Sequence, residues 1–411
     1  MKQIIASLDI GSNTIKLIVG EIFEDKLYVL SSAEVRSEGI KKGLIVDEEK
    51  CLEQVKEAFK RCEEVLGIKL DRVVLTVPSY SATFIKGEGY TTLSSDNKVD
   101  GSDITKSLQA SVYNRVSPNL DLVSVTPIEF LVNEEEIVKN PLGMETSRLT
   151  VSSILATAPK KNIEPFINML EKLNIKVVDL AFNGICDYYE FRNEKMKDKS
   201  VAIINIGGHK TEVSIVKEDI LINSETIDLG GRNVDRDISY IYDISVEEAK
   251  ELKENFALAH KSKSNTTEIV EVKTKDDNKI KINQYEISEV VYARYKEILT
   301  EAKKSINILT KEEISYIIVT GGGSEIDGFS KIFKEIFGSD KDLFTVNDLG
   351  VRNNKYSSTL GFIKYYKEKV NFRGKLASTI SEEKQEMLFN EKKKINENSL
   401  LGKVYSYFFD N

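Results

Sequence analysis

Histidine and cysteine are scarce in this chain of 411 residues, and their scarcity excludes several kinds of chemistry. The two histidines, His209 and His260, are isolated in the sequence, which argues against a zinc site and against a Ser–His–Asp triad. The cysteines, Cys51, Cys62 and Cys186, are odd in number and form no C-x-x-C pair, so no disulfide framework is predicted. We expect them to be small buried side chains in a reducing compartment.

Long apolar runs and an excess of positive charge are also missing. No apolar run reaches the roughly 18 residues that a membrane-spanning helix needs. Asp9 and Asn13 interrupt the apolar N-terminus, so we expect no signal peptide and a cytoplasmic location. The 58 Lys and Arg residues are outnumbered by 66 Asp and Glu residues. Nucleic acid is therefore not expected as a partner, because binding it requires clustered basic side chains.

The chain has enough apolar residues for a sizeable core. Hydrophobic residues make up 41% and charged residues 30% of the sequence, which is typical of soluble globular proteins. The length indicates two or three domains or one large bilobal unit. An amphipathic helical pattern at 48–67 is followed by a strand pattern at 68–78, and strands that alternate with helices favour an α/β fold.

Two segments about 196 positions apart repeat one pattern. Residues 7–22, SLDIGSNTIKLIVGEI, and 202–216, AIINIGGHKTEVSIV, each indicate a strand, a glycine-containing turn and a second strand. The string NIG at 205–207 stands where DIG stands at 9–11. Each segment taken alone is also compatible with a plain hairpin that binds nothing.

A third element consists of three glycines at 321–323, between a buried-looking strand and a helical pattern. Glycines there allow a backbone to approach a ligand, and they equally allow tight packing of helix on strand. Together, the two hairpin turns would offer backbone N–H groups to a polyphosphate, with the glycine turn against the base. Asp9 would hold Mg²⁺ through water. Neither a P-loop nor a dinucleotide motif occurs.

The duplicated hairpin with the glycine turn resembles the actin, Hsp70 and sugar-kinase superfamily, and within it the FtsA family of bacterial cell-division proteins. The resemblance covers about residues 4–370 and returns at the C-terminus. The strings that carry it are NPLGMETSRL at 140–149, LGGRNVDRDIS at 229–239, EEAKELKENFALA at 247–259 and VTGGGSEIDGF at 319–329.

The resemblance implies an α/β, actin-like two-lobed ATPase fold with an FtsA-type insert subdomain. The implied parts are a first lobe at 1–80 and 160–197, the insert at 81–159, a second lobe at 198–225 and 312–370, an outer subdomain of the second lobe at 226–311, a charged linker at 371–398 and a terminal helix at 399–411.

ATP with Mg²⁺ is the cofactor that the resemblance implies. Its binding residues would be Asp9, which also faces the metal, with Gly11, Ser12, Asn13, Lys16, Gly207, Gly208, His209, Lys210, Gly230, Gly231, Lys253, Gly321, Gly322 and Gly323.

Three departures from the family pattern bear on catalysis. Asn205 stands where the superfamily often has an acid near the metal. His209 and Lys210 replace the small or hydroxyl residues of the second phosphate turn, and Lys250 replaces a glutamate expected at the ribose. These departures indicate an atypical nucleotide site with at most weak ATPase activity. We find no carboxylate base for an acceptor hydroxyl, which disfavours a sugar kinase.

Residues 288–309 have strong helical periodicity, and Arg294 and Glu297 are neighbours on the surface of that helix. The simplest interpretation is a local ion pair. The resemblance implies more, because this helix is similar to the FtsA face that receives the C-terminal peptide of FtsZ. Arg294 and Glu297 would then help to hold that acidic tail.

The C-terminus combines a charge-rich stretch with an apolar end. Residues 371–398 indicate a solvated linker with some helical character. On a helix, residues 399–411 separate into a polar face and an apolar face, which predicts either docking on the protein itself or, by the resemblance, a membrane-targeting helix. The apolar face holds Leu400, Leu401, Val404, Tyr405, Phe408 and Phe409.

Taken together, the sequence predicts a peripheral protein of the division septum on the cytoplasmic side of the cell membrane. It would bind ATP, polymerise and tie FtsZ filaments to that membrane, with other division proteins docking on 81–159. The alternatives are a PilM-like scaffold for type IV pilus assembly and a phosphotransferase or phosphatase of the same superfamily.

Overall fold

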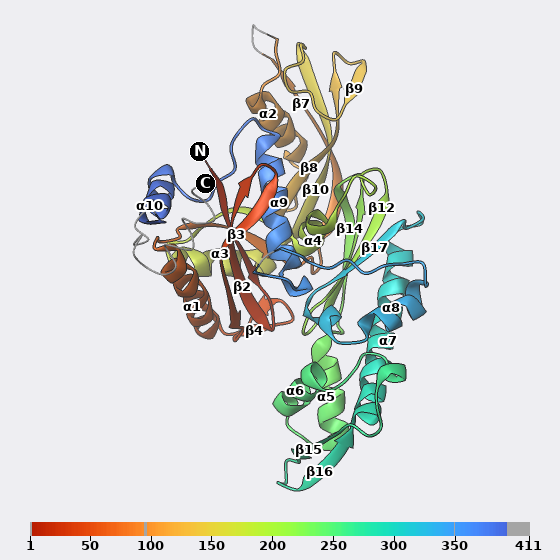
Figure 1. Cartoon of the computed structure of the whole chain (residues 1–411). Coiled ribbons are helices and arrows are strands. Elements are labelled where there is room, and N and C mark those ends of the chain that lie inside the picture. Colours follow the sequence, from red (N-terminus) through yellow and green to blue (C-terminus); the bar gives the residue numbers. More distant parts are fainter. Residues whose placement is uncertain (1, 94–96, 349, 393–411) are drawn as a thin grey trace, which may run out of the picture.

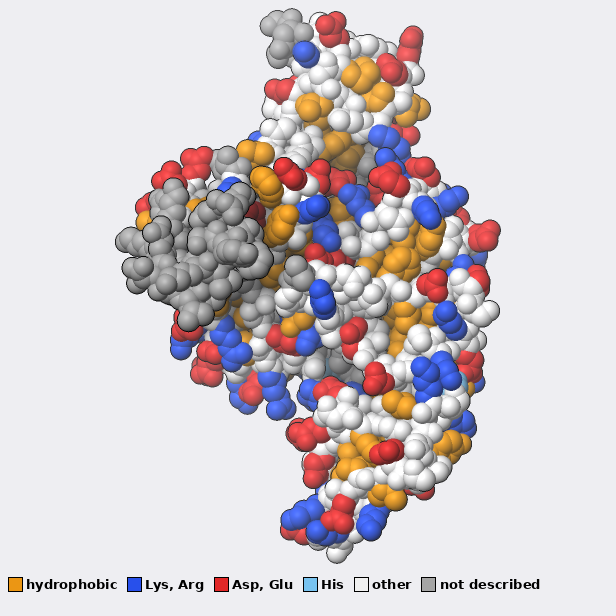
Figure 2. Space-filling model, in the orientation of Figure 1, with side chains coloured by type: hydrophobic (Ala, Val, Ile, Leu, Met, Phe, Trp, Pro, Cys, Tyr) orange, Lys and Arg blue, Asp and Glu red, His pale blue; other side chains and the backbone are white. Residues whose placement is uncertain are grey.

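The computed structural model describes residues 2–93, 97–348 and 350–392; residues 1, 94–96, 349 and 393–411, and the side chains of 390–392, lie outside the description. Figure 1 shows an elongated molecule, with two larger sheets in the middle and a smaller part at each end. Figure 2 shows Lys and Arg side chains interspersed with Asp and Glu over the visible face. The same face is indented where the lower part of the molecule meets the body.

The first sheet has five strands in the order β11-β6-β1-β2-β3. Strand β1 is buried along almost its whole length, in keeping with its largely apolar sequence. It pairs antiparallel with β2 and parallel with β6, which confirms the first predicted hairpin. The strands are β1 (Gln3–Ile10), β2 (Thr14–Phe23), β3 (Lys26–Arg36), β6 (Arg72–Val77) and β11 (Lys176–Phe182), with the two-residue strands β4 (Ile40–Lys41) and β5 (Leu44–Ile45) nearby.

Helix α1 (Glu48–Leu66) packs on β2 and β3 and confirms the amphipathic pattern. It begins where the Asp47 side chain accepts the Lys50 amide at 3.2 Å, and it ends at Gly67, whose φ of 72° suits glycine. Helices α3 (Lys160–Lys172) and α4 (Asn183–Phe191) follow later in the chain. The three cysteines are free and buried, as expected.

Residues 83–159 form a separate four-stranded antiparallel sheet with the order β7-β10-β8-β9. Helix α2 (Gly101–Val112) begins at a capping box of Asp100 and Asp103. It lies so close to the sheet that a Cβ on Gly89 would stand 2.2 Å from the Ser111 amide nitrogen, which explains glycine there. The strands are β7 (Thr83–Thr92), β8 (Leu120–Val132), β9 (Glu136–Val138) and β10 (Arg148–Pro159).

The second large sheet repeats the arrangement of the first. Strand β12 pairs antiparallel with β13 and parallel with β17, just as β1 pairs with β2 and β6, which confirms the second predicted hairpin. The sheet order is β14-β13-β12-β17. Its elements are β12 (Ser200–Ile206), β13 (Thr211–Lys217), β14 (Ile220–Ile227) and β17 (Tyr316–Thr320), and the helices α7 (Gln284–Leu309) and α8 (Phe329–Phe337) pack with them in one apolar cluster.

An outer part extends from the second sheet at the lower end of Figure 1. Helices α5 and α6 pack on each other, and α5 also packs on α7. This part contains α5 (Gly231–Tyr242), α6 (Val246–Asn255), the short 3₁₀ helix η1 (Lys261–Lys263) and the hairpin of β15 (Ile269–Lys273) and β16 (Lys279–Asn283).

Helix α9 (Ser357–Asn371) packs on the first sheet and not, as we expected, on the second. The resemblance assigned 312–370 to the second lobe, but α9 packs on β1, β2 and β6 of the first sheet and on α4. Its side chains Leu360, Phe362 and Ile363 are fully buried in the core of the first sheet, which is the physical reason for this correction. The short helices η2 (Gly322–Glu325) and η3 (Asn354–Tyr356) connect β17 to α9 through α8.

The segment after α9 corrects a second expectation, that of a solvated linker over 371–398. Thr379 is fully buried: its amide donates to the Ile4 carbonyl at 2.9 Å, and its hydroxyl accepts the Ala6 amide at 2.8 Å. Helix α10 (Glu382–Lys392) follows and buries Leu388 in the core of the first sheet. The few apolar residues of this charged stretch suffice to dock it, whereas 393–398 lie outside the described residues. Among the described helices, none combines the length and apolarity needed to cross a bilayer.

Candidate functional site

A cavity of about 430 Å³ lies between the first and second sheets. The turn after β1, the turn after β12, the start of α5 and the glycine turn after β17 all line it. The predicted residues that the cavity brings together are Asp9, Gly11, Ser12, Asn13, Lys16, Gly207, Gly208, His209, Lys210, Gly231, Lys253, Gly321, Gly322 and Gly323. Asn205 and Lys250, at which the sequence departs from the family pattern, also line it.

Gly230 is the one predicted binding residue outside this lining. A Cβ at this position would stand 2.6 Å from the Gly207 carbonyl oxygen and 2.8 Å from that of Gly208. The next two amides, of Gly231 and Arg232, donate to those same carbonyls at 2.9 and 2.7 Å. Gly230 therefore lets the start of α5 pack behind the second turn.

In the first turn, the Gly11 amide donates to the Thr14 carbonyl at 3.1 Å and closes the hairpin. Asp9 and Lys16 face each other across it, with Lys16 Nζ 2.9 Å from Asp9 Oδ2, and both side chains are buried. The hydroxyl of Thr76 donates to the other oxygen, Asp9 Oδ1, at 2.9 Å. Both oxygens of Asp9 thus already have partners from the protein.

Two of the three glycines in the glycine turn allow close packing, and the third leaves the backbone open. A Cβ on Gly321, whose φ is +83°, would stand 2.5 Å from the Ile206 carbonyl oxygen. A Cβ on Gly323 would stand 2.3 Å from a methyl carbon of Ile206. Gly322 has nothing within 4 Å of its Cβ position, so it leaves backbone open towards the cavity. Close packing and approach to a ligand, the two interpretations of this motif, thus apply to different glycines.

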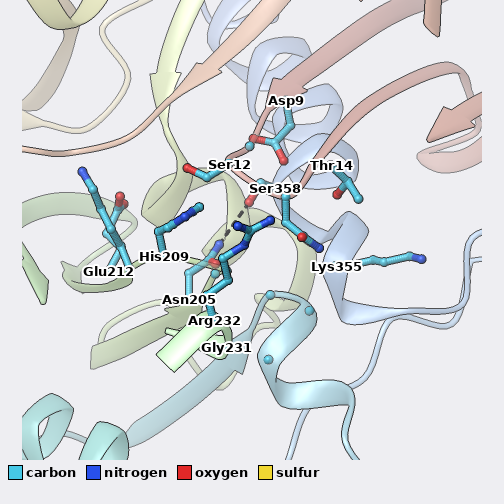
Figure 3. A pocket seen from close by; sticks show the side chains of 18 of the residues that line it. Asp9, Ser12, Thr14, Asn205, His209, Glu212, Gly231, Arg232, Lys355 and Ser358 are labelled. Carbon is cyan, nitrogen blue, oxygen red and sulfur yellow. Dashed lines mark hydrogen bonds between the residues drawn. The ribbon is translucent and has the colours of Figure 1, made fainter. Parts of the chain in front are cut away.

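Several charged side chains of the cavity are paired within the protein. Lys253 Nζ lies 2.6 Å from Asp235, and Lys355 Nζ lies 2.7 Å from Glu34. Figure 3 shows Lys355 on the opposite side of the view from His209 and Glu212.

Two titratable groups near the second turn have strongly shifted pKa values. Burial, together with the nearby cations Arg232 and Arg236, lowers the pKa of His209 to about 4. Burial raises the pKa of Glu212 to about 7, against the effect of the Ser79 amide that donates to its Oε2 at 3.0 Å. Near neutral pH, His209 is therefore uncharged and Glu212 is partly protonated.

Sequence reasoning missed several side chains of the cavity. Arg232 and Glu254 directly follow the predicted binding residues Gly231 and Lys253, so the same motifs could have indicated them. Glu34, Lys355 and Ser358 belong to no motif and reach the cavity only through the packing of β3, η3 and α9. These three had no signal in the sequence.

The two predicted partner residues lie on α7, away from the cavity. Arg294 binds Asp237 of α5 through two nitrogens, at 2.6 and 2.9 Å, and it binds Glu297 at 2.5 Å. The neighbouring pair expected from the spacing is confirmed, and Asp237 is an additional partner that the sequence did not indicate. The predicted membrane residues of 399–411 lie outside the described residues.

Two family models match separate parts of the chain. The model described as "Cell division protein FtsA" matches residues 202–361, and "SHS2 domain inserted in FTSA" matches residues 81–157. The "Cell division protein FtsA" of Bacillus subtilis (strain 168) is 27% identical over 376 residues, which span 91% of this chain and 86% of that protein.

Solved structures share the fold at low sequence identity. The "PilM-PilN type IV pilus biogenesis complex" superposes with a TM-score of 0.58 at 14% identity, covering 87% of this chain and 97% of that chain. MreB5 of Spiroplasma citri bound to ADP superposes with a TM-score of 0.55 at 15% identity, covering 90% and 97%. These similarities show the actin-like fold and nothing finer.

Proposed function

The chain belongs to the FtsA family of cell-division proteins, and on this premise we propose that it binds ATP and tethers FtsZ filaments to the cytoplasmic membrane. The observation that carries the proposal is the cavity itself. Its walls are the two glycine-containing hairpin turns and the glycine turn, one hairpin from each sheet. A polyphosphate between those turns would meet backbone N–H groups from both lobes.

Nucleotide would act as a link between the lobes. The turn of 9–14 belongs to the first sheet and the turn of 207–210 to the second. One ligand that contacts both turns therefore favours an arrangement in which the two lobes lie close together. MreB5, whose fold is similar, is solved with ADP. The proposed ligand here is ATP, with turnover slow or absent because Asn205 replaces an acid.

Attachment to the membrane is assigned to residues 399–411. Burying a large apolar side chain contributes roughly 1.5–3 kcal/mol, while ordering each backbone residue costs about 1–2 kcal/mol, so one such helix binds lipid weakly. Self-association into filaments would link many weak anchors and make the attachment effective. Other division proteins would dock on 81–159.

The FtsZ tail is assigned to the face formed by α5 and α7. One turn beyond Asp237, which binds Arg294, the side chains of Tyr240 and Ile241 are 87% and 54% exposed. This face therefore offers a cation for an acidic peptide and exposed apolar groups for its hydrophobic residues.

Co-sedimentation with liposomes tests the proposal as a whole. The full chain is pelleted with vesicles that contain anionic lipid, with and without ATP and an FtsZ tail peptide. We expect ATP to increase pelleting and the peptide to pellet only when the protein is present. Phe408→Asp combined with Phe409→Asp should leave the protein folded and in the supernatant; undiminished pelleting of this variant would refute the anchor.

A further inference from the structure

Five buried polar side-chain atoms of the cavity wall lack a hydrogen-bond partner within the described part of the chain. All five belong to residues that line the cavity, so water or a ligand in the cavity would supply their missing partners. They are Asn183 Oδ1, His209 Nδ1, Lys210 Nζ, Glu212 Oε1 and Thr226 Oγ1.

Lys210 is the cation among these atoms. It belongs to the second turn, but its Nζ reaches the first lobe, where it lies 3.9 Å from the centre of the Tyr80 ring. The same nitrogen lies 3.5 Å from the Cβ position of Gly43, whose amide donates to Ser12 Oγ in the first turn. Among the described residues, no carboxylate lies within ion-pair distance of Lys210.

Arg232 supplies a second cation at the same turn. Its amide donates to the Gly208 carbonyl at 2.7 Å, which fixes its backbone directly behind the turn. Its side chain lines the cavity, and Figure 3 shows it extending from the same side as His209 and Asn205. Within the described residues, Arg232 too lacks a carboxylate partner, whereas the cavity lysines 16, 253 and 355 each have one.

The two side chains at the ends of β1 and β12, Asp9 and Asn205, are poorly placed to hold a divalent cation. Asp9 accepts from Lys16 and Thr76. Asn205 is neutral, and its amide nitrogen is turned towards Asp187. Lys16 thus pairs the charge of Asp9 and position 205 carries no charge, so these two residues fit poorly the Mg²⁺ site that the sequence suggested at Asp9.

We propose that Lys210 and Arg232 hold the phosphate chain of the nucleotide directly, so that the cleft binds nucleoside triphosphate without a divalent cation. The inference rests on the proposed nucleotide binding. Lys210 in the second turn and Arg232 at the start of α5 have no carboxylate partner among the described residues. Beside the backbone N–H groups and an uncharged His209, they supply the positive charge that Mg²⁺ would otherwise bring to the phosphates. Glu212, whose pKa burial raises to about 7, carries less than a full opposing charge near neutral pH.

Calorimetric titration of the full chain with ATP, in excess Mg²⁺ and in excess EDTA, tests this inference. For the unmodified protein we expect the two dissociation constants to agree within about threefold. The combined variant Lys210→Gln with Arg232→Gln should bind ATP about tenfold or more weakly in EDTA, and Mg²⁺ should restore part of the loss. Adenosine, which has no phosphate, should bind the variant and the unmodified protein equally.

Lys42→Gln is the matched control, because Lys42 is adjacent to the cavity but pairs with Asp228 at 2.6 Å outside its lining. We expect this variant to bind like the unmodified protein in both buffers. Binding only in Mg²⁺, or equal binding by the double variant in EDTA, would overturn the inference and leave the proposed function standing. No binding of ATP in either buffer would instead refute the proposed function.

Discussion

Asn205 donates its side-chain amide to Asp187 Oδ2 at 2.7 Å, and this bond joins the end of β12 to α4 beneath the cavity. Asp187 is fully buried, and its other three hydrogen bonds come from the hydroxyls of Thr320, Ser357 and Ser358. Burial raises the pKa of Asp187, and these four donors act in the opposite direction. An amide at position 205 is thus what a buried carboxylate at 187 requires.

Replacing Asn205 by aspartate should destabilise the protein. Two carboxylates would then face each other in a buried site, and one of them would have to remain protonated. We expect Asn205→Asp to lower the free energy of unfolding by roughly 2–4 kcal/mol at neutral pH, and by less in acid. Urea denaturation at two pH values measures both effects.

Asn205→Ala is the control for this substitution. It removes the amide donor but adds no charge, so its loss of stability at neutral pH should be smaller than that of Asn205→Asp. If Asn205→Asp were as stable as the unmodified protein at neutral pH, the assigned role of the Asn205–Asp187 bond would be wrong.

Thr379 should be a key residue for docking the segment after α9. Its hydroxyl accepts the buried Ala6 amide, so Thr379→Ala leaves that amide without a partner. We expect a loss of roughly 1–3 kcal/mol in the free energy of unfolding and faster hydrogen exchange at Ala6. Thr379→Ser keeps the oxygen and should retain most of both properties. A solvated linker over this segment would instead make both substitutions neutral.

The sequence predicted the parts of the fold whose signals are local. Both hairpins, the strand before Gly321 and helix α7 follow directly from apolar periodicity and glycine position, and the structure confirms each of them. The family resemblance supplied the actin-like architecture. Long-range docking was not accessible, because the apolar pattern of α9 fits either sheet and only packing decides between them.

The same limit applies to the cavity. The glycine turns can be recognised in the sequence as short motifs. From them we predicted that the turns after β1, β12 and β17 lie together, and all three line the cavity. Side chains such as Lys355 and Glu34 are far apart in sequence and meet only when η3 packs beside β3. The docking of 376–389 was missed because only a few apolar residues, among them Ala377 and Ile380, carry it within a charged stretch.

Arg294 should contribute to peptide binding in competition with its own acidic partners. Arg294→Glu places three carboxylates together and should weaken binding of an acidic FtsZ tail peptide by about tenfold or more. Asp237→Asn releases one partner from Arg294 and should tighten binding. Fluorescence anisotropy with a labelled peptide measures both, and thermal unfolding checks that the variants fold. Unchanged affinity in Arg294→Glu would remove this residue from the binding face.

Glu212 should make stability depend on pH in a direction opposite to that of most carboxylates. Because burial raises its pKa from 4.5 to about 7, the folded state binds a proton more tightly than the unfolded chain does. The stability that this group contributes is complete below pH 4.5 and is lost as the pH rises through about 7. His209, whose pKa is lowered to about 4, acts oppositely, with stability lost as the pH falls from 6.5.

Comparison with Glu212→Gln isolates the contribution of Glu212, since His209 is present in both proteins. Glutamine stays neutral and retains an oxygen for the Ser79 amide. Relative to the unmodified protein, the variant should gain up to about 3 kcal/mol in unfolding free energy between acidic and mildly alkaline pH. Glu164→Gln, an exposed substitution on α3, should show no such trend. If the difference in unfolding free energy between Glu212→Gln and the unmodified protein stayed constant across this pH range, the raised pKa would be wrong. Glu212 would then carry a full negative charge in the cavity at neutral pH.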